Sequence, residues 1–130
     1  LQQALARYAD AEALGSAPAR LQYQKGVVLA RLGRWPESAD TLARAVTLDP
    51  SFPQGYLQLI EVATIMRQRH VALAAATRLV GLDPGTPGYW RELADQHQEW
   101  KNPRVARRML EQAARVHELA GTAATKPSHN

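Results

Sequence analysis

The side chains of this sequence that could bind a metal are few and scattered. The histidines are His70, His97, His117 and His129. No two of them stand four residues apart, and none belongs to a recognised metal-ligand spacing. The chain has no cysteine, which excludes disulfides and thiolate metal sites. The sequence therefore predicts no metal site.

A possible pair of catalytic carboxylates is formed by Asp95 and Glu99, which stand four residues apart and would share one face of a helix. On an exposed helix, two such carboxylates are far more often solvated than engaged in proton transfer. We therefore expect no catalytic residue and no cofactor, and we predict that the chain is not an enzyme.

A basic stripe is expected near the end of the chain, formed by Arg104, Arg107, Arg108 and Arg115. Single-stranded nucleic acids bind such stripes when aromatic side chains lie between the charges, and no aromatic residue lies here. Glu111 stands four residues from both Arg107 and Arg115 and is expected to pair with them. The stripe is interpreted as a solvated face, with an acidic partner or weak nucleic-acid binding as alternatives.

The elements that carry these side chains are predicted to be helices. The 130-residue chain is 45% hydrophobic, and alanine, the best helix former, is abundant along it. The net charge of +4 arises from 16 basic and 12 acidic residues that are interspersed, as on an ordinary soluble protein. No apolar run is long enough to cross a bilayer, and no signal-peptide pattern is present. Because the chain begins with Leu1, we expect a piece of a longer protein, cytoplasmic or periplasmic.

An internal repeat organises the chain. The segment Leu48-Asp49-Pro50 returns further along as Leu82-Asp83-Pro84. Within the segment 19–50, Gly33 separates two amphipathic stretches and Pro36 suits the first turn of the second one. A period of 34 with paired helices resembles the tetratricopeptide repeat (TPR). The resemblance implies an all-α fold, an α-solenoid in which about seven helices form a right-handed superhelix.

The period divides the chain into five segments. Residues 1–16 are expected to be the second helix of a truncated repeat, followed by whole repeats at 17–50, 51–84 and 85–120, and by a flexible polar tail at 121–130 that begins at Gly121. In the first whole repeat, Gly26 occupies a position that is small in the family. Gln22 departs from the family pattern, which has tryptophan there.

The second and third whole repeats differ in how well they keep the TPR pattern. In the second, Ile60 and Leu79 are large where the pattern is small, and Ala63 and Ala76 are small where it is large. Because core substitutions that keep the total side-chain volume are tolerated best, we expect the large and small side chains of this repeat to have exchanged positions while all four stay in the core. The turn at 67–69 lacks the usual glycine. The third repeat keeps the pattern with Trp90, Leu93, Ala94, Ala106, Leu110 and Ala113, and it puts His97 at a normally aromatic, partly buried position.

The resemblance also implies a ligand-binding concave face, which the first helix of each repeat lines. Carried over by register, its residues are Arg20, Tyr23, Val27, Arg31, Gln54, Leu57, Glu61, Ile65, Arg91, Asp95 and Gln98. Apolar anchors flanked by charges of both signs would suit a peptide or an inserted helix. The TPR subclass that clamps a C-terminal carboxylate needs donors where this sequence has Tyr23, Val27 and Glu61, so that subclass is excluded.

The implied function is protein binding by a scaffold or adaptor module of a larger protein, with bacterial envelope assembly or export as the candidate setting. One alternative is an appendage of an enzyme, such as a transferase, whose catalytic domain lies elsewhere. The other is a helix face that binds nothing. Self-association is also expected to be possible, because Leu1 and Leu5 would be exposed where a preceding helix should pack.

Overall fold

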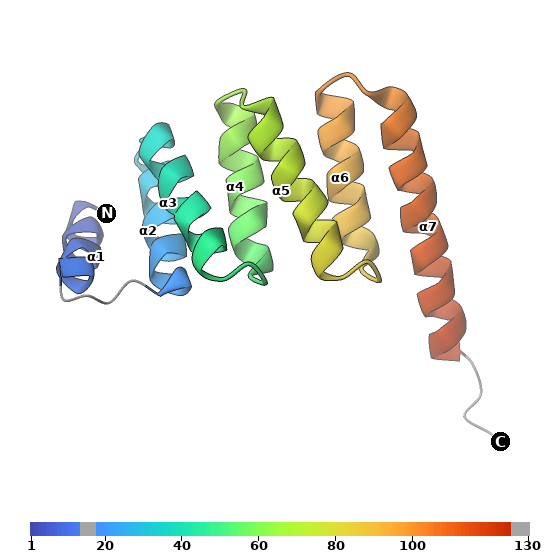
Figure 1. The fold of residues 1–130 in the computed structure, drawn as a ribbon, viewed down its shortest axis with the longest axis horizontal. Coiled ribbons are helices and arrows are strands. Elements are labelled where there is room, and N and C mark those ends of the chain that lie inside the picture. Colours follow the sequence, from blue (N-terminus) through green and yellow to red (C-terminus); the bar gives the residue numbers. More distant parts are fainter. Residues whose placement is uncertain (14–17, 126–130) are drawn as a thin grey trace. The chain divides into compact units, whose positions relative to one another are not determined.

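The computed structural model describes residues 1–13 and 18–125, and these residues form seven α-helices and no strand (Figure 1). The helices are α1 (Gln2–Ala13), α2 (Ala19–Arg31), α3 (Trp35–Leu48), α4 (Pro53–Ile65), α5 (Arg69–Leu82), α6 (Pro87–Glu99) and α7 (Pro103–Thr125). This result confirms the all-α prediction. The end of the first expected segment, residues 14–16, lies outside the described residues. None of the described helices is both long and apolar enough to cross a membrane.

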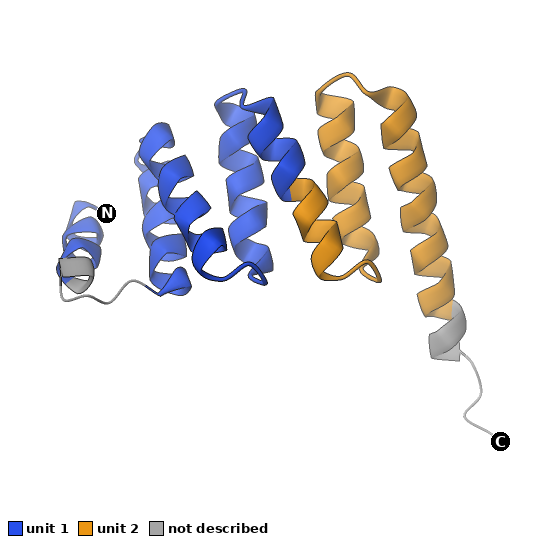
Figure 2. Ribbon diagram, viewed as in Figure 1, with its two compact units in different colours: residues 1–75 blue, residues 76–130 orange. Residues whose placement is uncertain are grey.

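The chain forms two compact units, Leu1–Ala75 and Ala76–Asn130 (Figure 2). In the first unit, α2 and α3 pack as a helical hairpin, α4 packs against both of them, and α1 contacts α2. In the second unit, α6 and α7 form a hairpin of the same kind.

The turns inside the hairpins repeat in atomic detail. Gly33, Arg67 and Lys101 occupy the same position in successive repeats, and they have positive φ angles of 73°, 58° and 65°. The next backbone N–H in each case donates to a carbonyl five residues back, with N···O distances of 2.9, 2.8 and 2.7 Å. This bond and the left-handed residue define a Schellman-type helix end. Arg67 thus adopts the turn geometry that glycine provides in the first hairpin.

The junctions between successive repeats also share a turn. The carboxylate of Asp49 accepts the backbone N–H of Ser51 at 3.1 Å, and that of Asp83 accepts the N–H of Gly85 at the same distance. Thr86, the residue before α6, donates its hydroxyl to the carboxylate of Asp83 at 2.7 Å and makes no side-chain capping bond to the helix. The short polar side chain of aspartate fixes each turn because it bonds the backbone two residues on.

At each of these junctions, an aromatic side chain of the following helix donates a hydrogen bond to a backbone carbonyl of the turn. Tyr56 donates its hydroxyl to the carbonyl of Pro50, and Trp90 donates its indole N–H to the carbonyl of Pro84, both at 2.8 Å. Gln22 occupies the same repeat position on α2. It is only 3% exposed, and its Oε1 has no hydrogen-bond partner among the described residues. The departure from the family pattern therefore leaves a buried acceptor unsatisfied.

Small residues allow α2 and α3 to cross closely. A Cβ added to Gly26 would lie 2.6 Å from Cγ of Leu42, a separation that packed atoms do not tolerate. The hydroxyl of Ser38 donates to the carbonyl of Gly26 at 2.7 Å. Ser38, Leu42 and Ala45 are fully buried at this crossing.

The exchange of large and small residues in the second repeat is also confirmed. Ile60 and Leu79 are buried, as are Ala63 and Ala76. The two large side chains fill space inside the protein at positions where the pattern expects small ones. The core is thus maintained with a different distribution of volume.

Two predictions for the last helix are wrong. α7 does not end before Gly121 but continues through it to Thr125, where alanines on both sides of the glycine favour helix. Residues 126–130 of the expected tail lie outside the described residues. Leu110, expected in the core, is 50% exposed, whereas Ala106 and Ala113 are buried as predicted. The cause is that α7 packs against α6 on one side of Leu110, while its other side has no cover within the described part of the second unit.

Candidate functional site

The first unit brings eight of the eleven predicted site residues onto two neighbouring helices. α2 contacts α4 directly. Tyr23, Val27 and Arg31 follow at four-residue steps along α2, and Leu57, Glu61 and Ile65 do so along α4, so each set lies on one side of its helix. We call this surface the α2–α4 face; its residues are Arg20, Tyr23, Val27, Arg31, Gln54, Leu57, Glu61 and Ile65.

Apolar side chains on the α2–α4 face are unusually open. Leu57 is 40% exposed and Ile65 is 47% exposed, whereas the rest of the apolar surface of α4 is buried. Tyr23 and Val27 are half-buried on the neighbouring helix. Two large aliphatic side chains, both exposed eight residues apart on one helix, make a surface suited to apolar anchors of a ligand.

Phe52, which the sequence analysis did not include, belongs to this surface. Its ring lies edge-on to the ring of Tyr23, with centroids 5.1 Å apart and planes at 78°. This geometry is the favourable one for an aromatic pair. Phe52 also lies against Gly55, where an added Cβ would be 3.1 Å from its ring. An aromatic residue directly before the helix-opening Pro53 is the signal that could have pointed to it.

The polar members of the α2–α4 face surround these apolar groups. Arg20, Arg31, Gln54 and Glu61 are exposed. The side chains of these four residues make no hydrogen bond or ion pair with another described residue. Their charges are therefore available to a ligand: two cations on α2 and one carboxylate on α4.

A small polar cavity of about 160 Å³ lies on a different part of the first unit, between α2 and α3. Its lining residues are Lys25, Leu29, Glu37, Asp40, Thr41 and Arg44. At its edge, Arg34 binds the carboxylate of Glu37 through two bonds of 2.8 and 2.6 Å. These bonds hold the pKa of Glu37 below its usual value. Because this pair is fully exposed, it adds little to stability.

The second unit carries the other three predicted residues on α6. Arg91, Asp95 and Gln98 are exposed there. Glu92 lies next to them and was not predicted; it is partly buried, and desolvation together with the nearby charge of Asp95 raises its pKa. Among the described residues, Asp95 and Glu99 do not belong to any group of His, Asp and Glu side chains that could hold a metal ion.

His97 is half-buried, as the sequence predicted, in the last helical turn of α6. Its Nδ1 lies 3.4 Å from the side-chain nitrogen of Asn102, in the turn that follows. Trp100, the first residue after α6, donates its indole N–H to Gln96 at 3.2 Å. These contacts indicate that the imidazole and indole stabilise the turn.

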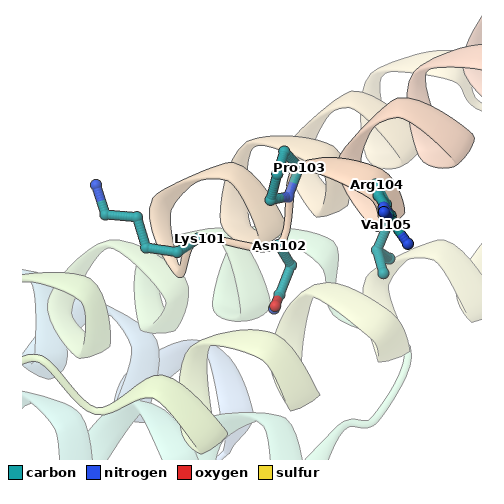
Figure 3. Close-up of a pocket in the computed structure, with 5 residues that line it drawn as sticks. All are labelled: Lys101, Asn102, Pro103, Arg104 and Val105. Atoms are coloured by element: carbon teal, nitrogen blue, oxygen red, sulfur yellow. The ribbon is translucent and has the colours of Figure 1, made fainter.

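Two shallow cavities lie in the second unit. One, of about 260 Å³, is lined by Lys101, Asn102, Pro103, Arg104 and Val105 (Figure 3). The five residues are consecutive, running from the α6–α7 turn into the start of α7, and the Lys101 side chain extends away from those of Asn102 and Val105 (Figure 3). The other, of about 420 Å³, is apolar and is lined by Pro84, Gly85, Val116, Leu119 and Ala120. Neither cavity brings together groups that could perform catalysis.

The basic stripe on α7 is exposed, as predicted, but its expected ion pairs are not formed. Glu111 has no ion pair with Arg107 or Arg115 in the described structure, and Arg115 instead contacts Gln112 at 3.4 Å. Exposed ion pairs on a helix are worth only about 0.5 kcal/mol, which is too little to hold two long side chains in place. The guanidinium groups of Arg107 and Arg108 are therefore open to solvent.

Helical hairpins joined by turns that recur at the same repeat position define a helical-repeat protein. No protein-family model matches the sequence, and no curated protein sequence is significantly similar to it. Solved structures do match, and they show that the chain has the tetratricopeptide-repeat fold.

Three of these structures illustrate the likeness. MamA (residues 41 to the end) from Desulfovibrio magneticus RS-1 is 19% identical over 90% of this chain and 66% of its own, with a TM-score of 0.75. YrrB, a TPR protein with an unusual peptide-binding site, is 23% identical over 92% and 63%, with a TM-score of 0.72. The first TPR domain of Spaghetti (RPAP3), bound to the HSP90 peptide SRMEEVD, is 15% identical over 75% and 78%, with a TM-score of 0.65. The chain spans about three fifths of the MamA and YrrB chains.

Proposed function

We propose that this chain is a protein-interaction module that binds a peptide or a helix on the α2–α4 face. The observation that carries the proposal is the exposure of Leu57 and Ile65 on a helix that neighbours Tyr23 and Val27. A buried position for these groups would have stabilised the fold, so their exposure is best explained by a ligand that covers them. The peptide-binding site of YrrB and the peptide bound to the RPAP3 domain support the same type of ligand.

The charges of the face restrict the ligand. Arg20 and Arg31 stand at opposite ends of the exposed side of α2, and Glu61 lies on α4 between Leu57 and Ile65. A ligand with aliphatic anchors, acidic groups toward its ends and a basic or polar group near Glu61 would satisfy all three charges. A free C-terminal carboxylate next to Glu61 would be repelled, so recognition of a chain terminus is not proposed.

A phage-displayed library of random peptides tests the proposal. Peptides selected on the chain should lose affinity by about tenfold or more when Tyr23 and Leu57 are both changed to alanine, because apolar anchors dominate such surfaces. The control is Leu48→Ala, which removes a leucine from α3 that is more exposed than Leu57 (54% against 40%) and does not belong to this face. If the peptides bound the double variant as tightly as the wild type, the α2–α4 face would not be their binding site.

The three predicted residues of α6 require a separate test. We propose that Arg91, Asp95 and Gln98 bind a peptide ligand on α6 of the second unit. Charge reversal at Arg91 and Asp95, singly, should then change the affinity of peptides selected on the chain in opposite directions. Unchanged affinity in both variants would show that this side of α6 binds no ligand.

The wider setting rests on analogy with other TPR arrays and stays a prediction. A bacterial scaffold for envelope assembly or export is the first candidate, and the appendage of an enzyme such as a transferase is the second. The coding sequence on both sides of this chain separates them. A catalytic domain would favour the second candidate, whereas further repeats or a membrane barrel would favour the first.

A further inference from the structure

The turn between α4 and α5 exposes aliphatic side chains on both of its sides. Ile65, the last residue of α4, is 47% exposed, and Val71, in the first turn of α5, is 38% exposed. The residues between them are the half-buried Met66 and four exposed polar residues, Arg67, Gln68, Arg69 and His70. We call residues 65–71 the α4–α5 tip. It lies within the first unit, at the end where α4 meets α5 (Figure 1).

The equivalent turns of the other two hairpins have a different character. Ile65 corresponds to Arg31 in the first hairpin and to Glu99 in the third. Val71 corresponds to Glu37 in the first hairpin and to a half-buried valine in the third. Each of those two turns contains a carboxylate, whereas the α4–α5 tip contains none. The tip therefore combines exposed aliphatic groups with positive charge alone.

The positive charge of the tip is not balanced within its own stretch of sequence. Between Glu61 and Asp83 the chain has Arg67, Arg69 and Arg78 but no aspartate or glutamate. Arg67 also has a positive φ angle of 58°, which strains any residue with a side chain. Backbone strain of this kind is concentrated at functional positions. A cation thus stands at a position of the turn where the backbone favours glycine.

The neighbouring elements do not cancel this charge. Because α3 runs back along α2 and α4 runs back along α3, α2 and α4 end on the same side of the first unit, so Arg31 and the α2–α3 turn lie on the side of the tip. Glu37, near that turn, is bound by Arg34. Glu61 lies one helical turn behind Ile65, about 6 Å further from the end of α4. The remaining charges of the polar cavity, one carboxylate and two cations, lie further from this end. This side of the unit is therefore positive.

A cationic end with exposed aliphatic groups matches the surface of an anionic membrane. Acidic headgroups attract exposed arginines, and aliphatic side chains beside them gain free energy by entering the boundary between headgroups and acyl chains. A membrane is broad enough to contact both sides of the turn, whereas a protein partner would need an acidic pocket shaped to it. Single-stranded nucleic acid is a poorer fit, because residues 65–71 contain no aromatic side chain on which a base could stack.

We propose that the α4–α5 tip binds the surface of a membrane that contains anionic phospholipids. Arg67 and Arg69 contact the headgroups, and Ile65 and Val71 enter the interface. The contact is peripheral, and it involves the end of a hairpin rather than a whole helix. The tip shares only Ile65 with the α2–α4 face, so the proposal does not depend on a peptide that binds there.

Sedimentation with vesicles tests the charge requirement. The full chain should bind vesicles of phosphatidylglycerol and phosphatidylcholine in equal amounts about tenfold or more tightly than vesicles of phosphatidylcholine alone, and added salt should weaken the binding. The double variant Arg67→Gly/Arg69→Gln should lose about tenfold in affinity for the anionic vesicles, because two cations are removed from the contact. Since glycine suits the positive φ angle at position 67, this variant should keep the helicity of the wild type by circular dichroism.

A second double variant is the matched control. Arg20→Gln/Arg44→Gln removes the same charge from two exposed arginines that lie nearer the opposite end of the first unit. At about 0.1 M salt, charges more than about 10 Å from the membrane are largely screened. The control variant should therefore bind the anionic vesicles as the wild type does.

A fluorescent label tests whether the aliphatic groups reach the lipid. The chain has no cysteine, so the variants Val71→Cys and Leu48→Cys can each carry a single environment-sensitive dye. Leu48 is 54% exposed and lies at the end of α3 that is opposite the tip. With anionic vesicles, the emission of the dye at position 71 should shift to the blue, and that of the dye at position 48 should not.

Several outcomes would overturn the proposal. These are equal binding to the two kinds of vesicle, equal losses for the two double variants, and an unshifted dye at position 71. A polyglutamate peptide or an oligonucleotide that bound as tightly as the anionic vesicles, and lost affinity in Arg67→Gly/Arg69→Gln, would show that the tip binds acidic polymers instead of a membrane. Peptides selected on the α2–α4 face should bind this double variant normally, so the two sites can fail separately.

Discussion

The hairpins α2–α3 and α6–α7 are built on the same repeat, but they use their second helices differently. α3 is covered on two sides, and its side chains are nearly all buried where they meet α2 and α4. α7 is covered by α6 and keeps a mixed apolar and basic side open. The comparison shows that a repeat sequence specifies the hairpin itself, whereas the environment of its outer side depends on which element comes next.

The largest effect is expected from truncating the two leucines at equivalent positions. Leu42→Ala should lower the free energy of unfolding of the first unit by about 3 kcal/mol or more, because it leaves a cavity between packed helices. Leu110→Ala should cost about 1 kcal/mol, since half of that side chain is already in water. Urea titrations followed by circular dichroism measure both losses. Equal losses would contradict the contrast between a covered and an open second helix.

The next largest change in stability is expected at Gln22, the buried unsatisfied acceptor on α2. Here the substitution should stabilise the protein rather than destabilise it. Gln22→Met keeps the shape of the side chain and removes the buried Oε1, so it should stabilise the first unit by about 1–2 kcal/mol. Tyr56→Phe is the matched change at the same repeat position; it removes the hydroxyl that bonds Pro50 and should destabilise by about 1 kcal/mol. Loss of stability in Gln22→Met would show that the amide has a partner that holds it in the native state.

The left-handed residues of the turns allow a smaller, reciprocal test. Lys101→Gly should stabilise the second hairpin by about 1 kcal/mol, because a side chain at positive φ is strained. Gly33→Ala should destabilise the first hairpin by a similar amount, about 1 kcal/mol, although nothing lies within reach of the added Cβ. Thermal unfolding of both variants measures the shifts. If the two substitutions moved the unfolding temperature in the same direction, the two turns would not share one backbone geometry.

The smallest effect is a pH dependence confined to the second hairpin. Because partial burial raises the pKa of Glu92, the folded chain holds that proton more tightly than the unfolded chain does. Stability contributed by the protonated form is present at acidic pH and is lost as pH rises through the ordinary glutamate value toward the raised one. Glu92→Gln should therefore be more stable than the wild type at pH 7 and equal to it near pH 4. Urea titrations at the two pH values measure this difference, and a difference that is the same at pH 4 and pH 7 would contradict the prediction.

The sequence predicted most of the fold because its signals are local. Gly33 and the two Leu-Asp-Pro segments mark turns whose chemistry is fixed by one or two residues, and the repeat period places every later helix from the first. The exchange of volumes at Ile60 and Ala63 was also predictable, since total volume and helical register suffice to state it.

What the sequence did not predict depends on contacts between elements. Leu110 has a core-type position, but its burial needs a neighbouring helix that the described residues of α7 after it do not supply. Phe52 was missed because its role arises from contact with Tyr23 on another helix. The end of α7 was misplaced because one glycine costs a helix only about 1 kcal/mol, which flanking alanines offset. The repeat register identified the residues of the α2–α4 face from the sequence. Only the structure indicates which of their side chains are exposed and can contact a ligand.

The length of α7 also has a practical consequence. A continuous helix advances about 1.5 Å per residue and bends little. The nine residues by which α7 exceeds α3 (23 against 14) thus amount to a stiff rod of about 13 Å. A fluorophore or reporter domain joined in helical phase after Thr125 would be held clear of the α6–α7 hairpin, at a separation that could be tuned residue by residue.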